Sequence, residues 1–181
     1  MTRRSFLTLA CGVMMLSACG FQLRGQQDYA FKRLVIVGAQ PPVAARLTRM
    51  VQGGSDTVVV NSTDNADAIL TMSEARGQST LTMNSSGVVE EYQITYSLYY
   101  QLVGKDGTAL IAPSVIVLNR AMTYSDQYAT AKQAESELLI ADMQNDAVDQ
   151  LTRRLSLVHS MHPAQPAPSV SPTTPLPSPP L

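Results

Sequence analysis

The sequence has few cysteines and histidines and no basic block, and each scarcity argues against a class of protein. Only two cysteines occur, and Cys11 lies in a segment that we expect to be removed. Cys19 would then be the only thiol, so no internal disulfide could form and the fold must rely on a hydrophobic core. Without Arg3 and Arg4, 11 basic residues face 14 acidic ones, a formal charge of −3. Together with the missing basic block, this charge argues against a nucleic-acid partner.

The first 18 residues have the three parts of a signal peptide. Two arginines near the start precede an apolar run at 6–16, which is shorter than the ~20 residues needed to span a bilayer. The ending Leu-Ser-Ala-Cys at 16–19 resembles a bacterial lipobox. We therefore predict that Cys19 carries N-acyl and S-diacylglycerol groups, whose chains suffice for stable membrane anchoring. The alternative is an ordinary signal cut after Ala18. Sec export is favoured, although the paired arginines also fit the twin-arginine route.

Composition divides the remaining chain into three parts. Residues 19–30 are expected to form a lipidated tether, and 31–158 a single folded domain. The last part, 159–181, contains eight of the eleven prolines, interleaved with serine, threonine and alanine. Such a segment cannot bury enough apolar surface to offset its ordering entropy, so we expect a disordered tail.

The first half of the domain predicts short elements and one long strand. An apolar run at 34–37 predicts a strand, and the two prolines at 41–42 open a helix that Gly53-Gly54 ends. A second strand is expected at 57–60. The stretch 68–83 alternates imperfectly, with Gly77 as a candidate bulge, and a turn follows at 84–87.

The second half begins with the clearest strand of the chain. Between 92 and 102, aromatic and aliphatic residues occupy every second position, while amides and hydroxyls occupy most of the others. A tight turn at 105–107 follows, and after Pro113 the next strand is expected from 115 to about 124. A long helix is predicted over 128–157, with Thr130 and Gln133 as a possible capping box. Its expected apolar stripe is Ala134, Leu138, Ala141, Val148, Leu151, Leu155 and Val158.

Two helices and about five strands predict a two-layer α+β sandwich.

Catalytic constellations are missing from this sequence. His159 and His162 follow the long helix, where neither is held against a nucleophile. Glu90 and Glu91 are neighbours in a strand, so they point to opposite faces. We therefore predict no enzyme activity, no metal site and no cofactor.

Two cations occupy positions that stability alone would not choose. Arg120 shares its strand parity with apolar residues, and Lys132 lies in the first turn of the long helix. A positive charge there is disfavoured by ~0.3–1 kcal/mol. Each could contact an anionic group. The alternative is snorkelling or a salt bridge to Asp126 or Glu135.

Three features of the sequence resemble one protein family. They are Cys-Gly-Phe-Gln-Leu-Arg at 19–24, Glu-Tyr-Gln-Ile at 91–94 and the long C-terminal helix. The chain resembles the LPS-assembly lipoprotein family LptE. The resemblance implies a small, mostly antiparallel or mixed sheet with two helices on one face. It also implies an outer-membrane lipoprotein, anchored on the periplasmic side and lodged in the lumen of the β-barrel LptD.

According to the resemblance, this plug helps to assemble the barrel and assists lipopolysaccharide insertion into the outer leaflet. It needs no cofactor. Cys19 matches the acylated cysteine, and Lys132 matches a basic position associated with lipopolysaccharide binding. A second such position falls in the turn 84–87, which has no cation here. The alternative function is a periplasm-facing lipoprotein module that binds a small ligand or another envelope component.

Overall fold

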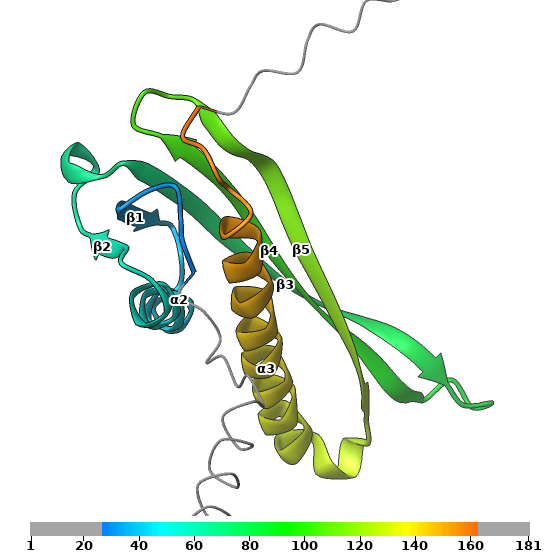
Figure 1. Ribbon diagram of the computed structural model, residues 1–181. Helices are drawn as coiled ribbons and strands as arrows, with labels where there is room; N and C mark the ends of the chain where they lie inside the picture. The colour runs from blue at the N-terminus through cyan, green and yellow to red at the C-terminus, as the bar shows by residue number, and fades with distance from the viewer. Residues whose placement is uncertain (1–26, 163–181) are drawn as a thin grey trace, which may run out of the picture.

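Three long strands and one long helix dominate the computed structural model, which describes residues 27–162 (Figure 1). Shorter elements complete the domain on its N-terminal side. In chain order the elements are β1 (Arg33–Val37), α2 (Pro41–Gly54), β2 (Val58–Val60), η1 (Thr63–Asn65), β3 (Ala68–Met83), β4 (Val89–Gly104), β5 (Ala109–Thr123), η2 (Asp126–Tyr128) and α3 (Ala129–Leu155).

The five strands form one mixed sheet in the order β2-β1-β3-β4-β5. β1 pairs in parallel with β2 and β3, whereas β3, β4 and β5 form an antiparallel meander. Both helices cover the same face of the sheet (Figure 1). We call this side the helix face and the opposite side the outer face. The predicted two-layer α+β sandwich is confirmed.

The alternation in β4 creates the centre of the core. Ile94, Tyr96 and Leu98 are buried on the helix face, while Thr95 and Ser97 point to the outer face and are only half-buried. Leu34, Leu70 and Leu102 extend this layer across the neighbouring strands. The period of two therefore predicted the buried side of the strand correctly.

The two helices bury apolar stripes against this layer. Val43, Leu47 and Val51 of α2, which recur every four residues, are all buried. The predicted stripe is also confirmed at Val148, Leu151 and Leu155, all at 0% exposure, whereas Val158 lies beyond the end of α3 and is half-buried.

The N-terminal half of the α3 stripe was predicted wrongly. Ala134, Leu138 and Ala141 are exposed, and Leu138 is 68% exposed. The buried residues there are instead Ser136, Ile140, Met143 and Gln144. These four residues recur at helical spacing and face the sheet. The buried row of the helix therefore contains a serine and a glutamine, although only apolar residues were expected in it.

Three local predictions also need correction. Gly77 pairs regularly with Thr95, and the irregularity in β3 lies between Thr80 and Met83. β5 already begins at Ala109, so Pro113 lies inside the strand. A proline is tolerated there because β5 is an edge strand and its register shifts at that point. The capping box does not form: Tyr128 is the N-cap of α3 and its side chain makes no capping hydrogen bond.

Both predicted hairpin turns are present. Gly87 has φ 77° and Gly107 has φ 84°, a conformation that favours glycine. The Asn84 side chain accepts hydrogen bonds from the backbone N–H groups of Ser86 and Val88, which fixes the first turn. The β3–β4 tip extends away from both helices (Figure 1).

Candidate functional site

Lys132 lies where the first turn of α3 meets the end of β5. Its Nζ is 2.8 Å from Glu135 Oε2 and donates to Thr123 Oγ1 over 2.9 Å. The Lys132 side chain is 19% exposed and the Glu135 side chain 46% exposed. The alternative expected for this lysine, a salt bridge to Glu135, is therefore formed. Two of its three N–H donors are thus used, and within residues 27–162 the third has no side-chain or backbone acceptor.

Arg120 ties β5 to the middle of α3. Its guanidinium Nη2 lies 2.8 Å from Asp146 Oδ2, and the Arg120 side chain remains 45% exposed. The expected partners, Asp126 and Glu135, are wrong for this arginine because the register of β5 places it beside a later turn of α3. Both cations nevertheless lie along the seam between β5 and α3.

The tip of the β3–β4 hairpin carries apolar side chains instead of a cation. Leu81, Met83 and Val88 are 47%, 58% and 49% exposed. The turn 84–87 between them has only asparagine, serine and glycine. The missing cation leaves Lys132 as the only matched basic position of the two that the family resemblance implies.

A carboxylate that the sequence analysis missed links four elements under the helices. Glu74 Oε2 accepts hydrogen bonds from the Tyr96 hydroxyl and from Gln144 Nε2, both over 2.9 Å. Glu74 Oε1 accepts from the backbone N–H of Gln40 over 3.0 Å. Burial, followed by the charge of Glu74, raises the pKa of Tyr96. The same signal that singled out Arg120 could have found Glu74, because it shares the strand parity of the buried Met72.

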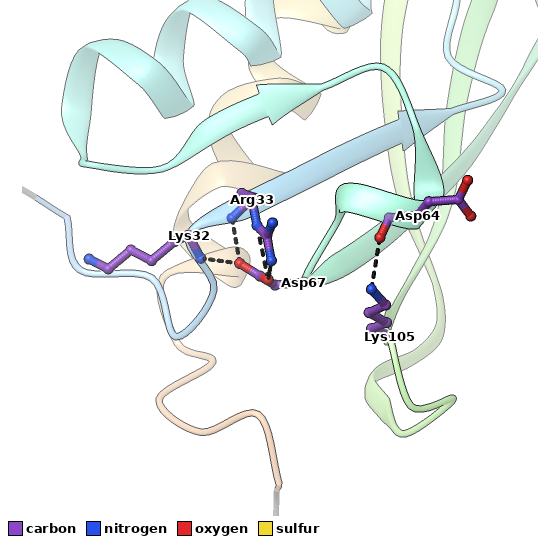
Figure 2. A network of polar contacts seen from close by, with 5 residues as sticks. All are labelled: Lys32, Arg33, Asp64, Asp67 and Lys105. Carbon is purple, nitrogen blue, oxygen red and sulfur yellow. Dashed lines mark hydrogen bonds and ion pairs between the residues drawn. The ribbon is translucent and has the colours of Figure 1, made fainter.

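A second network fixes the end of the sheet where β1 and β3 begin (Figure 2). Asp67 Oδ2 accepts from the backbone N–H groups of Lys32 and Arg33, over 3.2 and 2.9 Å. The Arg33 guanidinium lies 2.6 Å from Asp67 Oδ1, and its hydrogen bond lowers the pKa of Asp67. Lys105 Nζ donates to the backbone carbonyl of Asp64 over 2.7 Å, which joins the β4–β5 turn to η1. These contacts hold the parallel strands in register.

The residues weighed for catalysis are not brought together. His159 and His162 are both exposed, and His162 Nε2 lies 3.6 Å from Asp106 Oδ2. Glu91 accepts a hydrogen bond from the Thr82 hydroxyl, and Glu90 is exposed beside it. Within the described chain, no three histidine, cysteine or acidic side chains cluster as metal ligands would.

The candidate membrane anchor cannot be placed. Cys19, the signal peptide and the tether up to residue 26 lie outside the described residues. Between residues 27 and 162, no helix combines the length and apolar character needed to cross a bilayer.

Comparisons with known proteins agree with the resemblance noted in the sequence. The family model for LptE, described as lipopolysaccharide-assembly, matches residues 22–155. The LPS-assembly lipoprotein LptE of Photorhabdus laumondii is 26% identical over 164 residues, covering 87% of this chain and 89% of that protein. LptE of Yersinia enterocolitica is 27% identical over 161 residues, covering 85% of this chain and 76% of that protein.

Solved structures share the fold. An uncharacterised lipoprotein B from Nitrosomonas europaea superposes with a TM-score of 0.64 at 32% identity, covering 76% of this chain and 90% of that one. The rare lipoprotein B of Shewanella oneidensis has a TM-score of 0.57 at 20% identity, covering 68% and 93%, and supports the fold alone. The family match extends from before β1 to the last residue of α3. Because that span includes every helix and strand described above, this chain belongs to the LptE family.

Proposed function

We propose that this chain is the lipoprotein subunit that plugs and helps to assemble an LptD-type β-barrel and assists lipopolysaccharide insertion into the outer leaflet. The observation that carries the proposal is the LptE family match over residues 22–155. LptE proteins are non-enzymatic lipoproteins of lipopolysaccharide assembly and are associated with the outer membrane. Beyond this family role, we propose that the chain binds an LptD-type barrel and lies in the lumen of that barrel.

The dimensions of the meander support the role of a plug. β3 and β4 have 16 residues each and β5 has 15. At ~3.4 Å per residue, a 16-residue strand rises about 54 Å. The hydrocarbon core of a bilayer is ~30 Å thick. A domain of this length, placed along a barrel axis, would fill the height of the lumen.

Lipidated Cys19 would hold the domain at the periplasmic side of the outer membrane. Eleven residues separate Cys19 from Phe31, the first residue of the folded domain as the sequence predicts it. Fully extended, twelve steps of ~3.4 Å span about 40 Å. Cys19→Ala should release the protein from the membrane fraction or leave it unprocessed. An unchanged membrane fractionation would contradict the lipid anchor.

For the glycolipid contact we propose Lys132, with Arg120 as a second cation along the same seam. Among the described residues, Lys132 has only two partners for its three N–H donors, and its partner Glu135 is half-exposed, so an anionic phosphate could compete for the ammonium group. Ion pairs at the surface contribute only ~0–1 kcal/mol to stability, and solvent reaches this pair from the Glu135 side. Breaking the pair should therefore affect glycolipid binding more than folding.

The test compares Lys132→Glu and Lys132→Gln with Arg153→Glu, a charge reversal at an exposed position of α3. Lipopolysaccharide binding in vitro should weaken for both Lys132 variants and stay unchanged for Arg153→Glu. Melting temperatures should change little in all three. Loss of folding in both Lys132 variants would show a purely structural lysine.

The barrel partnership is tested by capture. The tagged protein, expressed at its normal level and purified from detergent-solubilised envelopes, should bring down a large β-barrel in equal amounts. Recovery of the protein alone, as a folded monomer, would contradict the plug and favour a binding module for a small ligand.

A further inference from the structure

A groove of about 370 Å³ lies on the outer face, beside the bulge in β5. Tyr100 pairs with Ser114, but Leu102 pairs with Ile111, so β5 has one extra residue at this point. Pro113 lies within this irregular stretch. The lining residues are Thr71, Met72, Ser73, Tyr99, Tyr100, Gln101, Pro113, Ser114 and Val115.

The groove combines an exposed aromatic ring with uncharged polar groups. Tyr99 is 49% exposed and Val115 is 41% exposed. Side chains alternate between the two faces along each strand, and the outer face receives the odd-numbered residues within 69–79, 93–103 and 115–121. None of these odd-numbered residues is charged. A matching ligand would be uncharged, with apolar rings for the Tyr99 side chain and carbonyl oxygens for nearby hydroxyl and amide donors.

The chain itself contains a segment with this chemistry. The 19 residues after His162 include eight prolines and no charged side chain. The spacing Pro-x-x-Pro occurs at 172–175 and again at 177–180. Segments with this spacing bind aromatic-lined grooves, because proline preorganises the chain and leaves its carbonyl oxygens free to accept hydrogen bonds.

The described chain ends close enough for this segment to reach the groove. His162 Nε2 lies 3.6 Å from Asp106 Oδ2 in the β4–β5 turn. Tyr99 is seven residues from Asp106 along β4, or about 24 Å at ~3.4 Å per residue. In polyproline II form, at ~3.1 Å per residue, 19 residues span about 59 Å. That length covers the path around the turn and leaves the last residues for the groove.

We propose that residues 172–181 bind the outer-face groove of the same chain, with proline rings packed on Tyr99 and Pro113. Because the two partners belong to one chain, their effective concentration is on the order of millimolar, so a contact of low intrinsic affinity can still be populated. Binding covers an aromatic and an aliphatic side chain that the sheet leaves exposed. The inference does not depend on the barrel partnership.

The test uses the mature chain, residues 19–181, with Cys19→Ser and a nitroxide label on Ser178→Cys. In amide-resolved NMR spectra, the label should broaden the signals of Tyr99, Gln101 and Ser114 more than those of Arg154, which lies on the helix face against the side chain of Tyr100. Tyr99→Ala should abolish this difference. Val117→Ala, on the same face but outside the groove, should preserve it.

A second variant keeps the whole domain unchanged. Replacing Pro172, Pro175, Pro177 and Pro180 by serine should also abolish the selective broadening. Equal broadening on both faces of the sheet would overturn the inference. Broadening that survives both Tyr99→Ala and the proline replacements would also overturn it. The same holds if lipopolysaccharide micelles bind the groove equally well in the parent and in the proline-replaced chain.

Discussion

Replacing Glu74 by alanine should destabilise the domain more than any other exposed or half-buried carboxylate change. Glu74 is half-buried and receives hydrogen bonds from Tyr96, Gln144 and the backbone of Gln40. These donors come from β4, α3 and the start of α2, so one side chain links both helices to the sheet. Alanine would leave all three donors without their acceptor.

The magnitude follows from how far water can reach the abandoned donors. Tyr96 is fully buried and Gln144 is 8% exposed, whereas Gln40 is exposed and can bond to water. A buried group left without its partner costs about 1–3 kcal/mol. Two such groups, partly relieved by relaxation, should lower the free energy of unfolding by about 2–4 kcal/mol. For a domain of this size the melting temperature would fall by roughly 5–15 °C.

Urea unfolding followed by circular dichroism measures this loss. Glu90→Ala is the matched control, because it removes an exposed carboxylate at the end of β4 and should change stability by less than about 0.5 kcal/mol. In a double-mutant cycle, Glu74→Ala and Tyr96→Phe should couple by about 1 kcal/mol. A Glu74→Ala loss no larger than that of Glu90→Ala would refute the reasoning.

Three further predictions concern Asp67, Gly38 and Gly53. The Arg33 hydrogen bond lowers the pKa of Asp67, so ionised Asp67 stabilises the fold above its unfolded pKa of ~3.9, and this contribution is lost as pH falls through the lower folded pKa. The difference in unfolding free energy between the parent and Asp67→Asn should therefore shrink from pH 7 to about pH 2; a pH-independent difference would contradict this. Gly38 has φ 81°, and an added Cβ would lie 2.3 Å from the Met72 carbonyl oxygen, so Gly38→Ala should cost at least about 2 kcal/mol. At Gly53 an added Cβ meets no atom within 4 Å, so Gly53→Ala should raise stability by up to ~1 kcal/mol. Thermal melts measure both glycine variants, and melting temperatures that shift in the same direction for Gly38→Ala and Gly53→Ala would contradict this reasoning.

Local periodicity predicted the elements that face one apolar layer. β4 alternates without interruption, and each of its buried positions from Ile94 to Leu102 was identified from the sequence. The predicted stripe of α3 was wrong at Leu138, because the residues that pack on the sheet there include Ile140 and Met143. Which row of a long helix faces the sheet depends on packing between distant segments, and composition alone does not determine it.

Which residues belong to the candidate site was easier to predict from the sequence than which partners their polar side chains contact. Arg120 and Lys132 stood out because each breaks a local rule, yet the partner of Arg120 is Asp146, 26 residues away. Glu74 breaks the same parity rule in β3, where the imperfect alternation concealed it. Such partners are set by the register between β5 and α3 and by the crossing of both helices over the sheet.

The most direct measurement of the proposed role is the amount of lipopolysaccharide at the cell surface after depletion of this protein. The account predicts that surface lipopolysaccharide falls as the protein is lost, and that the full chain restores it while Cys19→Ala restores less. Unchanged surface lipopolysaccharide in depleted cells would contradict a role for this chain in lipopolysaccharide insertion.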